Sequence, residues 1–284
     1  MRDVRSLTRL AWLGLVLLGI ALAGCSGDDG ADPAREALER ELRTDDTLTV
    51  CADPTRPPSA YRAADGVLRG FEVDLLGEVA ERLELEQAWI DVPRDETVDA
   101  VVAGSCDAAV STLAIRRDRG SLGRMAAIGY LGVPVSLLVR RGERSLGTTG
   151  LCGRRVGVLA GSLEQDLLEE HARTCAGRGG RLEVAPHTST PEAHAELRSG
   201  ALDAILDEHP VNAWFARRQT DRFDLAWVLG EEIVRWAIGV GIEKPELYHA
   251  IRATLRDLGH DGTFDSLLDT WGLDRAGVVR LPTT

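Results

Sequence analysis

The amino-acid sequence predicts an α/β protein of two lobes, each a mainly parallel sheet flanked by helices, joined by two crossover strands. Strands alternate with helices in one series that begins at Leu48 and in a second that begins at Arg155. Such alternation is typical of parallel sheets with helices on both faces. Two mainly apolar runs, 133–139 and 233–242, flank the second series. Because a chain that enters a second lobe must also return, we interpret these two runs as the crossover strands.

The first series begins with a short apolar strand and continues with an amphipathic helix. In this helix Phe71, Leu75, Val79 and Leu83 recur every four residues, which is the spacing of one helix face. The expected elements of this series are strands at 48–51, 88–92 and 107–110 and helices at 70–83 and 97–103.

The second series follows the same alternation, and two further helices close the chain. The expected elements are strands at 155–159, 181–185 and 204–206 and helices at 163–176, 191–199, 245–258 and 264–271. The predicted lobes are 46–136 plus 233–284 for the first and 137–232 for the second.

The N-terminal residues predict where the protein works. Arg2, Arg5 and Arg9 precede a charge-free apolar run at 10–23, and Leu-Ala-Gly then leads into Cys25. This order is typical of a secretory signal, here residues 1–24, and the run is short for a membrane span. The end of the run resembles the bacterial lipoprotein cleavage box, in which the cysteine is lipidated. An N-terminal transmembrane anchor is the alternative, and both place the rest of the chain outside the cytoplasmic membrane.

Composition limits the remaining possibilities. Residues 25–45 are polar and acidic, as expected of a tether, and a short helix at 33–43 is compatible with their pattern. A net charge of −12 with no basic patch makes nucleic acid an unexpected partner. Four cysteines remain after Cys25, an even number that suggests two disulfides outside the cytoplasm. Three pairings are possible, and four buried thiols are the alternative; we favour Cys51–Cys106 and Cys152–Cys175, because each pair then lies within one lobe. No pattern for a metal site is present.

Several segments, in order along the chain, resemble a known family. They are Asp53-Pro-Thr-x-Pro-Pro, then 66–74, 111–115 followed by Arg119, 153–162, 199–207 and 261–271. Together they resemble the family 3 extracellular solute-binding proteins, the amino-acid-binding subunits of ABC importers, over nearly all of 47–272. The resemblance implies a periplasmic-binding-protein-like (type II) fold, a monomer without cofactor or catalytic residues, and a membrane permease as partner.

The resemblance also implies roles for residues that would hold an amino acid. Arg119 corresponds to the family's carboxylate clamp, and a guanidinium suits that role because it makes two parallel hydrogen bonds. Asp207 corresponds to the carboxylate that binds the ligand ammonium. On sequence alone, the charged run around Arg119 favours a solvated surface arginine, and only the resemblance assigns it to the ligand. For Asp207, a helix cap before Pro210 is the alternative.

Further contacts are implied on both sides of the cleft. Ser111 and Thr112 would contribute hydroxyl and backbone groups from the first lobe, and Asp53 would lie at the cleft edge or form a turn before Pro54. Ser162 begins a capping-box pattern, Ser-x-x-Gln, and the start of that helix also offers N–H groups to an anion.

The sequence departs from the family where a ligand side chain is usually held. Arg56 and Arg94 stand where aromatic or large apolar groups are usual, and Ala114 replaces a hydroxyl residue. If both arginines face the pocket, they favour an acidic ligand such as glutamate, aspartate or a dicarboxylate; the alternative is that both are surface residues.

We therefore expect a lipid-anchored protein that captures a small polar solute, an amino acid in particular, and delivers it to an ABC permease. Three alternatives remain. A sensor subunit would bind ligand in the same way but pair with another membrane protein. A dehydratase on the same scaffold would need an acid such as Glu164 in the cleft. The contexts of Cys51 and Cys106 also resemble periplasmic accessory proteins of dehydrogenases.

Overall fold

The computed structural model describes residues 32–114, 125–144, 146, 150–273 and 279–280. The chain divides into two units, Met1–Asp32 and Pro33–Thr284, and the description below concerns the second. Cys25 lies outside the described residues.

The backbone of the fold is one mixed sheet with the strand order β5-β1-β6-β11-β7-β10-β8-β9. The strands in this order are β1 (Thr47–Ala52), β5 (Glu86–Asp91), β6 (Ala108–Ala114), β7 (Met125–Arg140), β8 (Arg155–Leu159), β9 (Glu183–His187), β10 (Ala204–Glu208) and β11 (Phe223–Gly241). A ninth strand, β12 (Val279–Arg280), pairs antiparallel with β7. Strand β1 pairs in parallel with β5 and β6, and β8 pairs in parallel with β9 and β10. Between these two parallel groups, β7 and β11 run antiparallel along most of their length.

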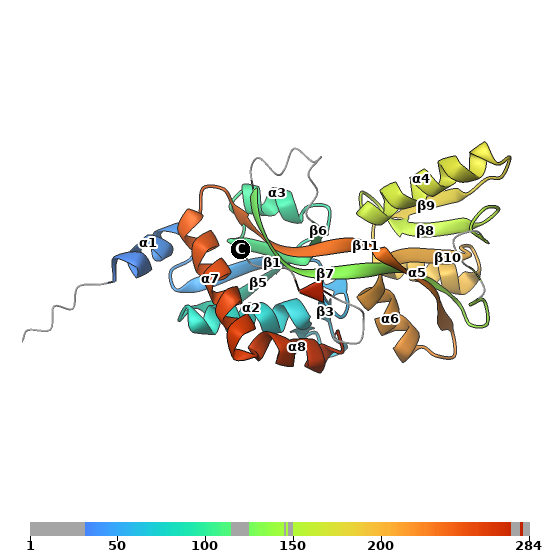
Figure 1. Ribbon diagram of the computed structural model, residues 1–284. Coiled ribbons are helices and arrows are strands. Elements are labelled where there is room, and N and C mark those ends of the chain that lie inside the picture. The colour runs from blue at the N-terminus through green and yellow to red at the C-terminus, as the bar shows by residue number, and fades with distance from the viewer. Residues whose placement is uncertain (1–31, 115–124, 145, 147–149, 274–278, 281–284) are drawn as a thin grey trace, which may run out of the picture. The chain divides into compact units, whose positions relative to one another are not determined.

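The two long strands join two lobes, which confirms the predicted fold class. Figure 1 shows β7 and β11 side by side between a first lobe with α2, α3, α7 and α8 and a second lobe with α4, α5 and α6. The first-lobe helices are α1 (Pro33–Glu41), α2 (Phe71–Arg82), α3 (Thr97–Val102), α7 (Pro245–Asp261) and α8 (Thr263–Trp271). The second-lobe helices are α4 (Leu163–Gly177), α5 (Thr190–Ser199) and α6 (His209–Arg218).

Helix α1 lies inside the segment expected as a tether. Arg35 donates to the carbonyl oxygen of Leu83, which follows α2, and the Glu41 carboxylate accepts the Leu247 N–H in the first turn of α7. Leu38 is buried in the main core. Residues from Pro33 onward therefore pack on the first lobe.

A small second sheet lies beside α2 and has no counterpart among the expected elements. It consists of β2 (Thr55–Arg56), β3 (Ala60–Arg62) and β4 (Leu68–Arg69). Gly70 follows it with φ +151°, and a Cβ there would lie 2.0 Å from the carbonyl oxygen of Ser59. Only glycine fits this close approach, which brings α2 against the small sheet and so fixes the position of β2.

Each lobe contains one disulfide. Cys51 in β1 is bonded to Cys106, just before β6, with the Cα atoms 5.8 Å apart. Cys152, just before β8, is bonded to Cys175 in α4, with the Cα atoms 5.6 Å apart. These are the two pairs favoured from the sequence, and both separations are usual for disulfides.

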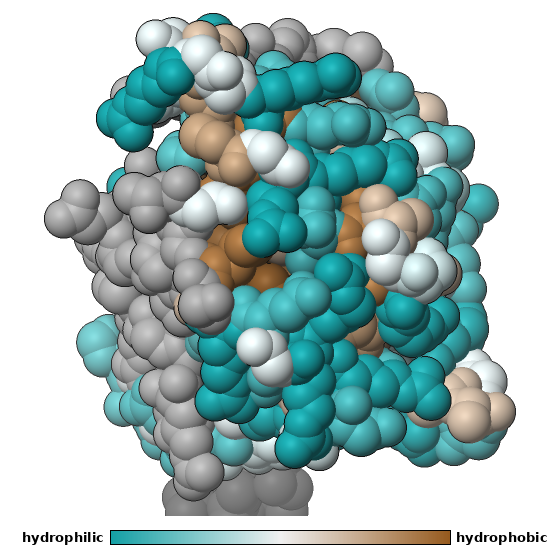
Figure 2. All heavy atoms as spheres, turned by 90° about the vertical axis from the view of Figure 1, so that its right-hand side faces the viewer, coloured by the Kyte–Doolittle hydropathy of each residue, from teal (hydrophilic) through white to brown (hydrophobic). Residues whose placement is uncertain are grey.

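The outer face of the second lobe is hydrophilic for the most part. Figure 2 shows this face, with the strongest apolar colour at the floor of a hollow. Over the described residues, Val67 and Ile242 are the large hydrophobic side chains that are exposed. Charged groups at the surface are therefore ordinary here, whereas charged groups buried between the lobes need an explanation.

Candidate functional site

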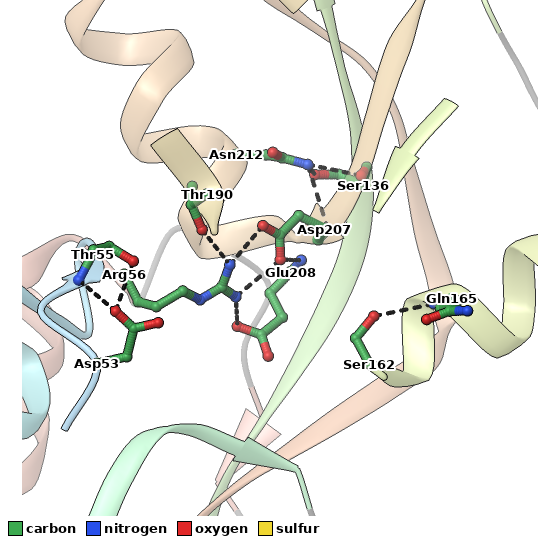
Figure 3. Close-up of polar contacts among 10 residues, drawn as sticks. All are labelled: Asp53, Thr55, Arg56, Ser136, Ser162, Gln165, Thr190, Asp207, Glu208 and Asn212. Atoms are coloured by element: carbon green, nitrogen blue, oxygen red, sulfur yellow. Dashed lines mark hydrogen bonds and ion pairs between the residues drawn. The ribbon is translucent and has the colours of Figure 1, made fainter. Parts of the chain in front are cut away.

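A buried arginine of the first lobe reaches carboxylates of the second. The Arg56 Nη1 atom donates to Asp207 Oδ2 at 2.7 Å, and Nη2 donates to Asp207 Oδ1 at 2.9 Å and to Glu208 Oε2 at 2.9 Å. Nη1 also donates to the Thr190 hydroxyl at 3.0 Å. The Arg56 side chain is only 1% exposed, and Figure 3 shows its guanidinium enclosed by these three residues. We call Arg56, Asp207, Glu208 and Thr190 the interlobe cluster.

The local fold explains where the acidic members lie. Asp207 and Glu208 end strand β10, which pairs antiparallel with crossover strand β7. Asn212, one turn into α6, donates through its amide to the Ser136 carbonyl oxygen on β7 at 2.8 Å. This bond ties the start of α6 to the crossover strand and holds the end of β10 towards the first lobe.

The helix-cap alternative for Asp207 is not what the structure shows. Helix α6 does begin after β10, with Glu208 at the N-cap and Pro210 in the first turn, but the N-cap makes no side-chain hydrogen bond. Asp207 Oδ1 accepts the Glu208 backbone N–H at 2.8 Å, and both of its carboxylate oxygens bind Arg56. The Asp207 side chain is therefore committed to the guanidinium.

The electrostatics of the cluster follow from its burial. Burial lowers the pKa of Arg56, but the charges of Asp207 and Glu208 outweigh this and raise it above its ordinary value. Burial raises the pKa of Glu208 well above its ordinary value, against the opposing charge of Arg56. The guanidinium is therefore permanently charged, whereas the Glu208 carboxyl is biased towards its protonated form.

Glu164 and Arg94 extend the cluster. Glu164 in α4 is buried, and burial followed by the charge of Asp207 raises its pKa. The charge of Arg94, from the first lobe, lowers the pKa of both Glu164 and Glu208, so Arg94 is near enough to act on the same group of carboxyls. Over the described residues, Arg56 Nε, Arg94 Nε and Glu164 Oε1 are buried polar atoms without a hydrogen-bond partner.

Two other expected residues make local contacts. Asp53 Oδ1 accepts from the Thr55 N–H at 2.9 Å and the Thr55 hydroxyl at 2.7 Å, which fixes the turn into β2. Ser162 caps α4 and accepts the Gln165 N–H at 3.1 Å, while the Gln165 side chain accepts the Gly161 N–H at 2.7 Å. Figure 3 shows the Ser162 hydroxyl joined to Gln165 and not to the interlobe cluster.

Two expected residues are described by their backbone alone, and a third is not described. Ser111 and Thr112 lie in β6, and the structure describes their backbone but not their side chains. Arg119 lies outside the described residues.

Sequence reasoning did not select Glu208 or Thr190. Glu208 follows Asp207 directly, and the pair of acids before His-Pro was a detectable signal, although it is also typical of a helix start. Thr190 begins an ordinary amphipathic helix, and no local pattern marks it as a neighbour of Arg56.

An aromatic group makes a second contact between the lobes. Tyr61 of β3 and Trp214 of α6 have ring centroids 5.2 Å apart, and Trp271 of α8 lies 6.2 Å from Trp214. Arg218 lies over the Trp214 ring at 3.1 Å from its centroid. Among the described residues, a charged and an aromatic contact thus join the lobes in addition to β7 and β11.

Two α/β lobes on a pair of crossover strands define the class of two-lobed periplasmic-binding-protein folds. Within that class, the pattern of the family described as "Bacterial extracellular solute-binding proteins, family 3" matches residues 48–274. The chain belongs to this family, whose members are binding proteins that act outside the cytoplasm. Of the helices that the structure describes, none has the length and apolar character needed to cross a membrane.

Known relatives agree with this assignment. The chain is 26% identical to the histidine-binding periplasmic protein of Salmonella typhimurium, over 88% of this chain and 94% of that protein. It is 25% identical to the L-cystine-binding protein of Escherichia coli K12, over 93% of this chain and 96% of that protein. A solved ancestral arginine-binding protein bound to arginine shares the fold, with a TM-score of 0.72 and 24% identity over 79% of this chain and 97% of that one.

Proposed function

We propose that this protein captures a small carboxylate-bearing solute, an amino acid or a dicarboxylate, between its lobes and delivers it to an ABC permease. The observation that carries the proposal is the interlobe cluster, because it gathers charged side chains of both lobes, Arg56 from one and Asp207 from the other, in a buried place. The amino-acid-binding relatives support the ligand class.

The proposed mechanism is hinge closure about β7 and β11. The proposed lobes are 46–136 plus 233–284 and 137–232. Ligand would meet Arg119, Ser111 and Thr112 on the first lobe and then the start of α4 at Ser162 on the second. Only contacts that differ between the open and closed states can drive closure, so residues from both lobes must touch the ligand.

The proposed cellular arrangement follows from the N-terminal sequence. Lipidation of Cys25 after removal of residues 1–24 would hold a monomer at the outer face of the membrane, with the residues between Cys25 and α1 as its link. Cys25→Ala should release the protein from the membrane fraction, and mass spectrometry of the wild-type N-terminus should find the lipid. A wild-type protein that is soluble and carries an unmodified Cys25 would contradict the anchor.

Ligand binding is tested by thermal denaturation of the full chain with each amino acid and with common dicarboxylates. Ligand at a hundred times its dissociation constant adds about 2.7 kcal/mol of stability, which is a shift of a few degrees in the melting temperature. Arg119→Ala should abolish the shift, whereas Arg82→Ala, which removes an exposed ion pair with Asp261, should not. Absence of a shift with every compound would refute the proposal.

A further inference from the structure

The carboxylate expected to receive a ligand ammonium is already occupied by the chain's own guanidinium. Both oxygens of Asp207 accept hydrogen bonds from Arg56. Glu208 and Thr190 accept from the same guanidinium, so four acceptor atoms of the second lobe are held by one side chain of the first. A primary ammonium has three donors and lacks the planar fork, and it cannot reproduce this set of bonds.

Two of the buried polar atoms left over are suited to an anion. Over the described part of the chain, the partnerless buried atoms of this region include the N–H donors Arg56 Nε and Arg94 Nε; the others are one oxygen of Glu164, Asn212 Oδ1 and the two ring nitrogens of His194. Burial raises the pKa of Glu164 and of Glu208, which biases both carboxyls towards the uncharged, proton-donating form. Arg56 and Arg94 thus share this region with the Asp207 carboxylate, which is already paired with Arg56, and with two carboxyls whose charged form burial disfavours.

A ligand ammonium would add another positive charge to this region. It would lie near Arg56, whose carboxylate partner is already paired, and two cations that share one buried carboxylate repel each other. A carboxylate or hydroxyl oxygen at the same place would instead accept from the remaining N–H donors.

Resting on the proposed function, we propose that Arg56 takes the place of the ligand ammonium and that the solute is a carboxylic acid without an α-ammonium group, a dicarboxylate or a hydroxy acid. Arg56 is then the residue that makes the protein bind such acids in preference to the corresponding amino acids. The inference narrows the solute class and leaves the fold, the closure and the permease unchanged.

Titration calorimetry of the full chain with matched compounds tests this directly. Succinate, L-malate and L-aspartate differ only in the substituent at one carbon, as do glutarate, L-2-hydroxyglutarate and L-glutamate. We expect the ammonium-free members of the preferred set to bind at least tenfold more tightly than the amino acid. This comparison uses the wild-type protein and needs no variant.

Substitutions assign the preference to Arg56. Arg56→Met removes the cation and keeps a side chain of similar length. It should raise the affinity for the amino acid, relative to the ammonium-free acid of the same set, by tenfold or more, because Asp207 becomes available to the ligand ammonium. Arg56→Lys keeps a cation and should keep the wild-type order. Arg62→Met is the matched control: Arg62 is in the same small sheet and binds Asp91 through two hydrogen bonds of 2.6 Å, but the pair is exposed. It should leave every affinity unchanged.

Two outcomes separate failure of this inference from failure of the proposed function. Equal affinities within a set, or tighter binding of aspartate or glutamate by the wild-type protein, would overturn the inference and leave the proposed function standing. Absence of binding by all six compounds and by the remaining amino acids would overturn both.

Discussion

Replacing His194 with leucine should remove a loss of stability that the wild-type protein suffers as the pH falls below neutrality. His194 lies in α5 and is buried, and its ring packs against Phe215 with centroids 3.8 Å apart. Over the described residues, neither ring nitrogen has a hydrogen-bond partner. An imidazolium has no favourable place there.

The size of the effect follows from the pKa of His194. Burial is the main cause that lowers this pKa from 6.5 to about 4; the charges of Arg56 and Arg198 lower it further and Asp207 opposes them. Because the folded-state pKa is depressed, the unfolded chain binds the proton first. The stability that neutral His194 gives the folded state is therefore fully present above pH 6.5 and is lost as the pH falls through 4. At pH 4 the loss is about 3 kcal/mol, from 1.36 kcal/mol per pKa unit.

Urea denaturation at pH 8, 6, 5 and 4 measures this for the wild-type protein and for His194→Leu. Leucine is of similar volume and does not titrate, so the difference between the two unfolding free energies should change by about 3 kcal/mol in favour of the variant between pH 8 and pH 4. His249→Leu, at an exposed position of α7, is the control and should leave the pH dependence as in the wild type. Parallel pH profiles for the wild type and His194→Leu would refute the reasoning.

Three other substitutions test the packing that holds the lobes in shape. Replacing Cys152 and Cys175 by alanine opens a loop with a sequence separation of 23 and should lower the unfolding free energy by about 3 kcal/mol in urea; an unchanged value would contradict the disulfide. Gly70→Ala should prevent folding, because its Cβ would lie 2.0 Å from a backbone oxygen, whereas Gly177→Ala meets nothing within 4 Å and should fold as well as the wild type. Lys244→Met should lower the free energy of unfolding by about 3–5 kcal/mol, because the buried Asp107 carboxylate, 2.7 Å from Lys244 Nζ, loses its cation. Circular-dichroism melts of the variant and the wild type that coincide would rule this out.

The order of elements along the chain was predictable because it depends on local patterns. The helix expected at 163–176 is α4 (Leu163–Gly177), and the strand expected at 155–159 is β8 (Arg155–Leu159). Both crossover strands were predicted from their apolar runs, although the structure extends the first from 133–139 to Met125–Arg140 and the second from 233–242 to Phe223–Gly241. The added part of each strand pairs with the other strand, and strand pairing is a tertiary property.

The elements that were missed lack a local signal of their own. Helix α6 follows β10 without a break and begins with His209-Pro210, which on sequence alone is as compatible with a turn as with a helix start. Strands β2 and β4 contain two residues each, which is too short for any periodicity. Their conformation is decided by pairing with β3 and by the close approach of Gly70.

The sequence by itself determined the two-lobed α/β class, the crossover strands and a cysteine pair within each predicted lobe, because hydrophobic periodicity and composition act over short stretches of chain. Only the tertiary structure decided that Arg56 binds Asp207, 151 residues further along the chain, and that Glu208 and Thr190 complete the cluster. No pattern within either segment encodes that contact. It exists because the small sheet on one lobe and the end of β10 on the other meet where water is excluded, and a buried guanidinium there must find its counter-charge.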